Sequence, residues 1–156
     1  MPLNVSYIVV IIQSIFSLPY DGADNACFHV LRHTVTVAAG MTVICGGRKS
    51  DKLEYAFELV DDDRDGKLSR QGLWRFLRSF LTVLVSLSSA NNVMKDERTI
   101  SAVDSGASWA VSQAFGPDSS TRLISFDDFA LWYTKGGYGI IPWLELLDLR
   151  KWVIFP

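Results

Sequence analysis

Residues 61–72 read DDDRDGKLSRQG, and this stretch decides the fold that the sequence predicts. Aspartates stand at its first, third and fifth positions, so three carboxylates are available to one hard cation. Gly66 at the sixth position favours a sharp turn, because a residue without a Cβ enters the left-handed backbone region easily. The backbone carbonyl of the seventh residue and a hydroxyl or bound water at the ninth can add further oxygens. The predicted metal ligands are Asp61, Asp63, Asp65, Lys67 and Ser69.

Apolar residues recur at helical spacing on both sides of this loop. Those before it are Leu53, Ala56, Phe57 and Val60, and those after it are Leu73, Phe76, Leu77 and Phe80. Each set follows the i, i+3, i+4, i+7 pattern of one helix face. The sequence therefore predicts a helix that ends at the acidic run, a loop, and a second helix that continues to the polar break at residues 88–92.

The loop and its flanking helices together resemble the EF-hand superfamily. The apolar Leu68 at the eighth loop position adds to this resemblance, which covers residues 28–136. The separation of the two units, lengthened by a polar linker at residues 90–104, resembles that of the calcineurin B and neuronal calcium sensor types. The resemblance implies Ca²⁺ as the cofactor, with Mg²⁺ as a second cation.

One position departs from the family pattern. The family places a bidentate glutamate at the twelfth loop position, whereas this chain has Gly72. Because ligand number and charge set the affinity, we expect Ca²⁺ binding to be weakened by ~100-fold or more. Neither Gln71 nor Arg70 replaces the missing carboxylate.

Residues 122–133, RLISFDDFALWY, resemble the second half of another such unit. Ile124 corresponds to the eighth loop position and Asp128 to the twelfth, and Leu68 is expected to face Ile124 across a short antiparallel contact. The positions for the other ligands hold Pro117, Ser119, Thr121 and Arg122. We interpret this second unit as structural, because too few oxygens remain to hold Ca²⁺. The predicted fold is all-α, an EF-hand pair with extra N-terminal and C-terminal helices.

The domain organisation predicted from composition has three parts. Residues 1–25 form an apolar N-terminal segment, residues 26–137 the EF-hand-like domain, and residues 138–156 an apolar C-terminal segment that packs on the domain or on a partner. The apolar stretch at residues 5–18 is shorter than the roughly 20 residues of a membrane-spanning helix, which argues against a membrane protein. It is either a secretory signal or, as we prefer, a buried helix or strand, since it lacks a basic flank.

Composition also excludes several classes of function. A formal net charge of −2 without a basic stripe argues against a nucleic-acid partner. Two cysteines, Cys27 and Cys45, are too few for a disulfide scaffold, and we expect free thiols in the cytoplasm. The only histidines, His29 and His33, lie on one predicted helix and form no catalytic group with other residues. The chain is therefore not expected to be an enzyme.

We expect a weak-affinity calcium sensor or regulatory domain that binds an amphipathic helical target. The alternatives are a structural protein-interaction domain that has lost its metal response, and a regulatory fragment of a larger enzyme. Large apolar side chains near the C-terminus are the predicted partner-binding residues, namely Trp132, Trp143, Leu147 and Trp152. The C-terminal segment either occupies the chain's own groove, docks on a partner, or closes the domain as a core helix.

Overall fold

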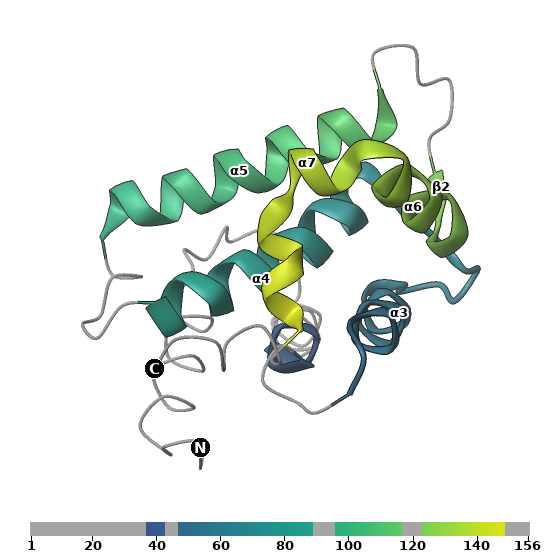
Figure 1. Ribbon diagram of the computed structural model, residues 1–156, viewed down its shortest axis with the longest axis horizontal. Helices are drawn as coiled ribbons and strands as arrows, with labels where there is room; N and C mark the ends of the chain where they lie inside the picture. The colour runs from purple at the N-terminus through teal and green to yellow at the C-terminus, as the bar shows by residue number, and fades with distance from the viewer. Residues whose placement is uncertain (1–36, 43–46, 89–95, 117–122, 149–156) are drawn as a thin grey trace.

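The computed structural model describes residues 37–42, 47–88, 96–116 and 123–148 (Figure 1). After a short helical stretch at residues 37–42, the elements are α3 (Lys49–Val60), β1 (Lys67–Ser69), α4 (Arg70–Ser88), α5 (Glu97–Phe115), β2 (Leu123–Ser125), α6 (Phe126–Trp132), the π-helical turn η3 (Tyr133–Gly137), α7 (Tyr138–Ile140) and the 3-10 helix η4 (Pro142–Leu147). The described chain is thus mainly helical, with one small two-stranded sheet. The all-α prediction is confirmed at that level.

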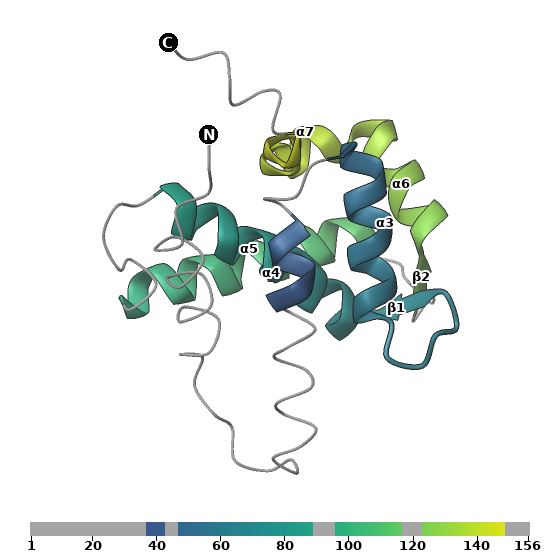
Figure 2. The same ribbon diagram turned by 90° about the horizontal axis from the view of Figure 1, so that it is seen from below.

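The two longest helices, α4 and α5, pack against each other along their length (Figure 1). The helix α3 packs on α4, and the segment from α6 to η4 returns across the same helix. In Figure 2 the loop between α3 and β1 lies at one end of α3, away from η4. Consequently α3 carries the acidic loop at its end and meets the C-terminal segment near its beginning.

The helix α3 forms where apolar spacing predicts it. Its four predicted apolar positions are all buried, namely Leu53, Ala56, Phe57 and Val60. Asp61 caps the C-terminal end, with its backbone N–H donating to the carbonyl of Phe57 at 3.1 Å. The helix begins at Lys49, with Arg48 as its N-cap. No side chain caps this end, so the start is not set by capping.

An aromatic cluster around Phe76 forms the centre of the core. Its ring meets those of Phe57, Phe80 and Phe129 edge to face, with centroids 5.7, 5.1 and 5.6 Å apart. Such pairs stabilise beyond the burial of their area, by about 0.5–1.5 kcal/mol each. Phe57, Leu73, Phe76, Phe80 and Phe129 are all buried in this core, whereas Trp132 is only half-buried.

The exit helix of the second unit, α6, continues past its last residue. It passes into the π-helical turn η3, which contains Gly136 and Gly137, and then into α7. Gly136 takes a φ of 145°, which a residue with a Cβ rarely adopts. The glycine therefore produces a kink inside a continuing helical path, because the apolar residues that follow it pack back on the core.

Several predicted features lie outside the described residues. These are the N-terminal segment 1–25, the part of the predicted helix that carries His29 and His33, the loop at residues 117–122, and Cys27, Cys45 and Trp152. Among the helices that the structure describes, none is both long enough and apolar enough to cross a membrane.

Candidate metal centre

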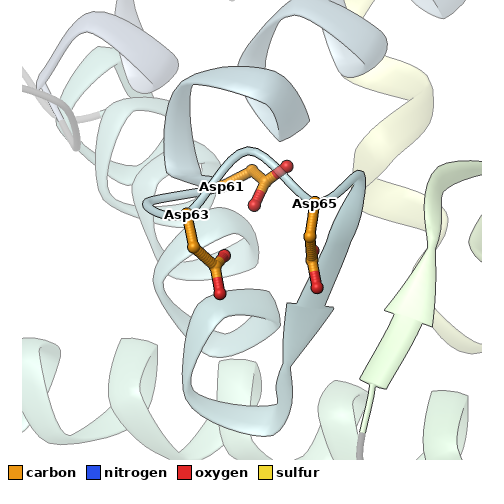
Figure 3. Close-up of side chains that lie close together, drawn as sticks. All are labelled: Asp61, Asp63 and Asp65. Carbon is orange, nitrogen blue, oxygen red and sulfur yellow. The ribbon is translucent and has the colours of Figure 1, made fainter.

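Three carboxylates converge in the loop that joins α3 to β1. One oxygen each from Asp61, Asp63 and Asp65 lies within 4.8 Å of the others (Figure 3). Within the described part of the chain, this is the one group of three or more acidic, histidine or cysteine side chains close enough to share a metal. Hard carboxylate oxygens at this spacing fit a hard divalent cation such as Ca²⁺ or Mg²⁺.

The loop backbone holds the carboxylates in place. Gly66 has a φ of 76° and Arg64 a φ of 56°, so the chain turns sharply at both residues. The Gly66 N–H donates to Oδ2 of Asp61 at 2.8 Å, and the Lys67 N–H donates to Oδ1 of Asp65 at 2.8 Å. Backbone N–H groups of the loop are therefore hydrogen-bonded to the side chains at its first and fifth positions.

Asp61 is the buried member of the cluster. It is only 8% exposed, while Asp63 and Asp65 face solvent. Its Oδ1 atom is buried and accepts no hydrogen bond from the described residues, although its Oδ2 is bonded to Gly66. An unpaired buried acceptor costs about 1–3 kcal/mol, and more when it is charged. A cation among the three carboxylates is one partner that removes this cost.

The remaining predicted ligands lie in the strand that follows. Lys67 and Ser69 are the first and last residues of β1, where they pair with Ser125 and Leu123 of β2. The Ser69 hydroxyl accepts from the backbone N–H of Gly72 at 3.1 Å, and so caps the start of α4. Its oxygen retains a lone pair for a cation or a water.

The twelfth loop position lies inside α4 and offers no oxygen from a side chain. A Cβ added at Gly72 would stand 3.3 Å from both Cβ and Cδ2 of Leu68. This is a tight contact with an apolar side chain that is itself buried. Gly72 therefore fits closely against β1, and α4 contributes no carboxylate at this position.

The second unit repeats the backbone geometry at its strand. Leu68 pairs with Ile124, as the sequence predicts. The Ser125 hydroxyl accepts from the N–H of Asp128 at 3.1 Å, in the same relation that Ser69 has to Gly72. The carboxylate of Asp128 in turn accepts from the backbone N–H of Ser125 at 3.4 Å, which completes a capping box, and it also accepts from the Ser125 hydroxyl at 2.6 Å. Asp128, the expected equivalent of the twelfth position, is thus engaged in helix capping.

One aspartate of the acidic run points to a different partner. Asp62 forms an ion pair with Arg75 of α4, with oxygen to nitrogen distances of 2.7 and 3.5 Å. Arg75 is largely buried and Asp62 half exposed. The pair ties the loop to α4 without using a carboxylate of the cluster. Sequence reasoning missed it, because it joins residues that are 13 apart across a turn.

The predicted partner-binding residues have different environments. Trp132 packs on Phe129, with ring centroids 5.8 Å apart. Trp143 is half-buried and, with the half-exposed Trp109, lines an open apolar groove of about 510 Å³ between α4 and α5. Leu147 is fully buried in the chain's own core. In this arrangement Leu147 is covered by the chain itself, and its role in partner binding stays a prediction.

A polar cluster near the start of α3 was not predicted. The Lys49 ammonium pairs with the Glu145 carboxylate, and the Tyr133 hydroxyl donates to the same oxygen at 2.5 Å. Burial, with the bond to Glu145, raises the pKa of Tyr133 above its ordinary value of 10.0. Helical spacing could have placed Tyr133 inward, but not beside a lysine so far away in sequence.

A separate group of polar side chains lies at the start of α3. Hydrogen bonds from Arg48 and then from Ser50 lower the pKa of the exposed Asp51.

No family model matches this sequence, and no solved structure matches the chain. The function is therefore inferred from the loop, its geometry and the surfaces around it.

Proposed function

We propose that this chain is a cation-binding helical module of the EF-hand type, which acts by binding a helical protein target rather than by catalysis. Its cation site is the loop at residues 61–72, with three carboxylates as the main ligands. The observation that carries the proposal is Asp61, which belongs to a preformed group of three carboxylates and whose buried Oδ1 has no hydrogen-bond partner among the residues that the structure describes. A bound divalent cation supplies that partner.

The relation between the two loops supports the EF-hand assignment. Their strands pair in the register Leu68 opposite Ile124, and each strand ends in a serine that caps the following helix. A pair of helix-loop-helix units joined through such a short sheet is the arrangement that the resemblance implies. Its helices enclose one common core, as expected for units that bury their apolar faces against each other.

The ligand set indicates weak binding. Ca²⁺ takes six to eight oxygens, usually including a bidentate carboxylate from the twelfth position. Here the Lys67 carbonyl, the Ser69 hydroxyl and water must complete the shell around three carboxylates. We expect a dissociation constant of about 10⁻⁴ M or weaker, at the low end of the affinities that such loops reach. Mg²⁺ retains several waters and so competes for the same oxygens.

Calorimetric titration with CaCl₂, and separately with MgCl₂, tests the cation site. The informative comparison is between Asp63→Asn and Asp62→Asn, since both residues are exposed but only Asp63 belongs to the cluster. We expect Asp63→Asn to weaken Ca²⁺ binding by about tenfold or more, because ligand charge sets affinity. Asp62→Asn should change it by less than about threefold, through the loss of a nearby charge.

A second function is favoured by one observation, the glycine at the twelfth position. Without a carboxylate from α4, the fold could be retained as a structural interaction domain whose metal response has been lost. In that case neither cation would produce binding heat at millimolar concentration, and the Asp63→Asn and Asp62→Asn variants would be equally inert. Such a result would replace the first proposal with the second.

A further inference from the structure

Three apolar anchors attach the C-terminal segment to the rest of the molecule. Ile141, Leu144 and Leu147 are each 0% exposed. Leu144 and Leu147 lie three residues apart on one side of the 3-10 helix η4, which has three residues per turn, and Ile141 is the N-cap of that helix. The helix η4 contacts both α3 and α4, and Figures 1 and 2 show it crossing α4 close to the beginning of α3.

Two lysines on the first turns of α3 hold the same segment by polar contacts. Lys49 pairs with Glu145, and its Nζ lies 4.8 Å from the centre of the Tyr133 ring. Lys52 is 5% exposed, and its ammonium donates to the backbone carbonyl of Leu147 at 2.8 Å. A buried lysine that neutralises the carbonyl end of a helix is a specific arrangement, since a buried ammonium without such a partner is costly. The surface on α3 thus selects a helical segment that ends near Lys52 and carries an acidic side chain near Lys49.

The connection between this segment and the preceding helix is irregular. The path kinks at Gly136, and Ile141 interrupts the helix with a φ of −119° and a ψ of 62°. The six residues of η4 form a 3-10 helix, whose hydrogen bonds have poorer geometry than those of an α-helix. Short elements of this kind open locally at a lower free energy than the core.

We propose that residues 141–147 form a displaceable strap, seated on the surface of α3 and α4 where the module docks its target. The target is a short amphipathic helix with apolar residues three or four apart and an acidic residue that meets Lys49, in the manner of Glu145. This inference rests on the target-binding part of the proposed function and is independent of the cation. Because the strap is tethered, its effective concentration is about millimolar for a short link, and a free peptide competes with it poorly.

A fluorescent peptide with the sequence of residues 138–148, YGIIPWLELLD, tests the proposal by anisotropy on the full chain. The chain is used unchanged and as the double variant Leu144→Ala/Glu145→Gln, which weakens the strap and leaves Lys49 and Lys52 in place. We expect the variant to bind the peptide at least about tenfold more tightly than the unchanged chain, since the competitor is weakened. Adding Lys49→Ala to the variant, or Glu145→Gln to the peptide, should reduce the binding by about threefold or more.

Hydrogen exchange of the unchanged chain tests the strap without any substitution. Amides of residues 143–148 should exchange at least about tenfold faster than those around Phe76 and Phe80 in α4, through local opening. Exchange of both sets at one common rate would overturn the proposal, because the segment would then open only when the whole core unfolds. Equal peptide binding by the unchanged chain and the double variant would overturn it as well.

The cation titration separates this inference from the calcium proposal. If the double variant binds the peptide but the chain binds neither cation, the strap proposal stands and the calcium proposal is wrong. If the chain binds a cation but the double variant does not bind the peptide, the calcium proposal stands and the strap proposal is wrong.

Discussion

Leu68 lies directly opposite Ile124 in the antiparallel pair of β1 and β2, and the two residues are only 2% and 7% exposed. They join the acidic loop to the second unit at the middle of the three paired positions of this small sheet. A shift of one strand by one residue would turn its apolar side chain away from the core, since strand residues alternate between faces. The contact therefore sets both the register of the sheet and the position of the loop end.

We predict that Leu68→Ala destabilises the chain by about 2–5 kcal/mol, because it removes a buried side chain and leaves a cavity. The measurement is urea-induced unfolding followed by circular dichroism. Leu123→Ala is the matched control, since Leu123 lies in the partner strand but is 44% exposed. That variant should lose less than about 1 kcal/mol. Equal losses would show that the strand pair does not contribute to the core.

Gly72→Glu should tighten Ca²⁺ binding by at least about an order of magnitude, because it restores a carboxylate at the twelfth position. Any residue with a Cβ at this position meets Leu68 at 3.3 Å. The control is therefore Gly72→Gln, which has the same steric effect but no charge. Calorimetric titration of the three chains should give a clear gain for glutamate alone. An unchanged titration for Gly72→Glu would remove residues 61–72 as the cation site.

The raised pKa of Tyr133 predicts a loss of stability at alkaline pH. The folded chain holds the phenol proton more tightly than the unfolded chain, whose tyrosines ionise near 10.0. The stabilisation is thus complete below pH 10 and falls as the pH rises towards the higher pKa of the folded state. Tyr133→Phe should remove this pH-dependent stabilisation. At a constant salt concentration, the free energy of unfolding of the variant should therefore decline less between pH 9 and 11 than that of the unchanged chain. Parallel curves for both chains would contradict the Tyr133 to Glu145 bond.

The ion pair of Arg78 with Asp104 joins α4 to α5, and we predict that removing either partner destabilises the chain by a different amount. Arg78 is almost buried, bonds to Asp104 at 2.6 Å and stacks over Trp74, whereas Asp104 is 40% exposed. Asp104→Ala leaves a buried guanidinium without its carboxylate, but Arg78→Met leaves a carboxylate that water can reach. Urea unfolding should show Asp104→Ala to be the more destabilising, by about 1–2 kcal/mol after allowance for solvent screening. The opposite order would mean that packing by the arginine stem outweighs its charge.

The sequence by itself determined the features that depend on local spacing. Apolar residues at helical intervals identified α3 and α4 and their buried faces, since the period of a helix is a property of the chain alone. The acidic positions and Gly66 identified the loop, and the matching place of Leu68 and Ile124 after each loop identified the strand pair. The carboxylate cluster followed from the same pattern, because alternate residues of one tight loop are close together in any fold that forms it.

Only the tertiary structure decided which distant side chains meet. Whether Asp62 joins the cluster or pairs with Arg75 depends on how α4 lies against the loop. Whether Leu147 is free for a partner or buried depends on the kink at Gly136, which returns the C-terminal segment to the core. The contacts of Lys49 with Glu145 and of Lys52 with Leu147 span 96 and 95 residues. Such contacts leave no periodic signal in the sequence, because they arise from the packing of whole helices rather than from the spacing of neighbours along the chain.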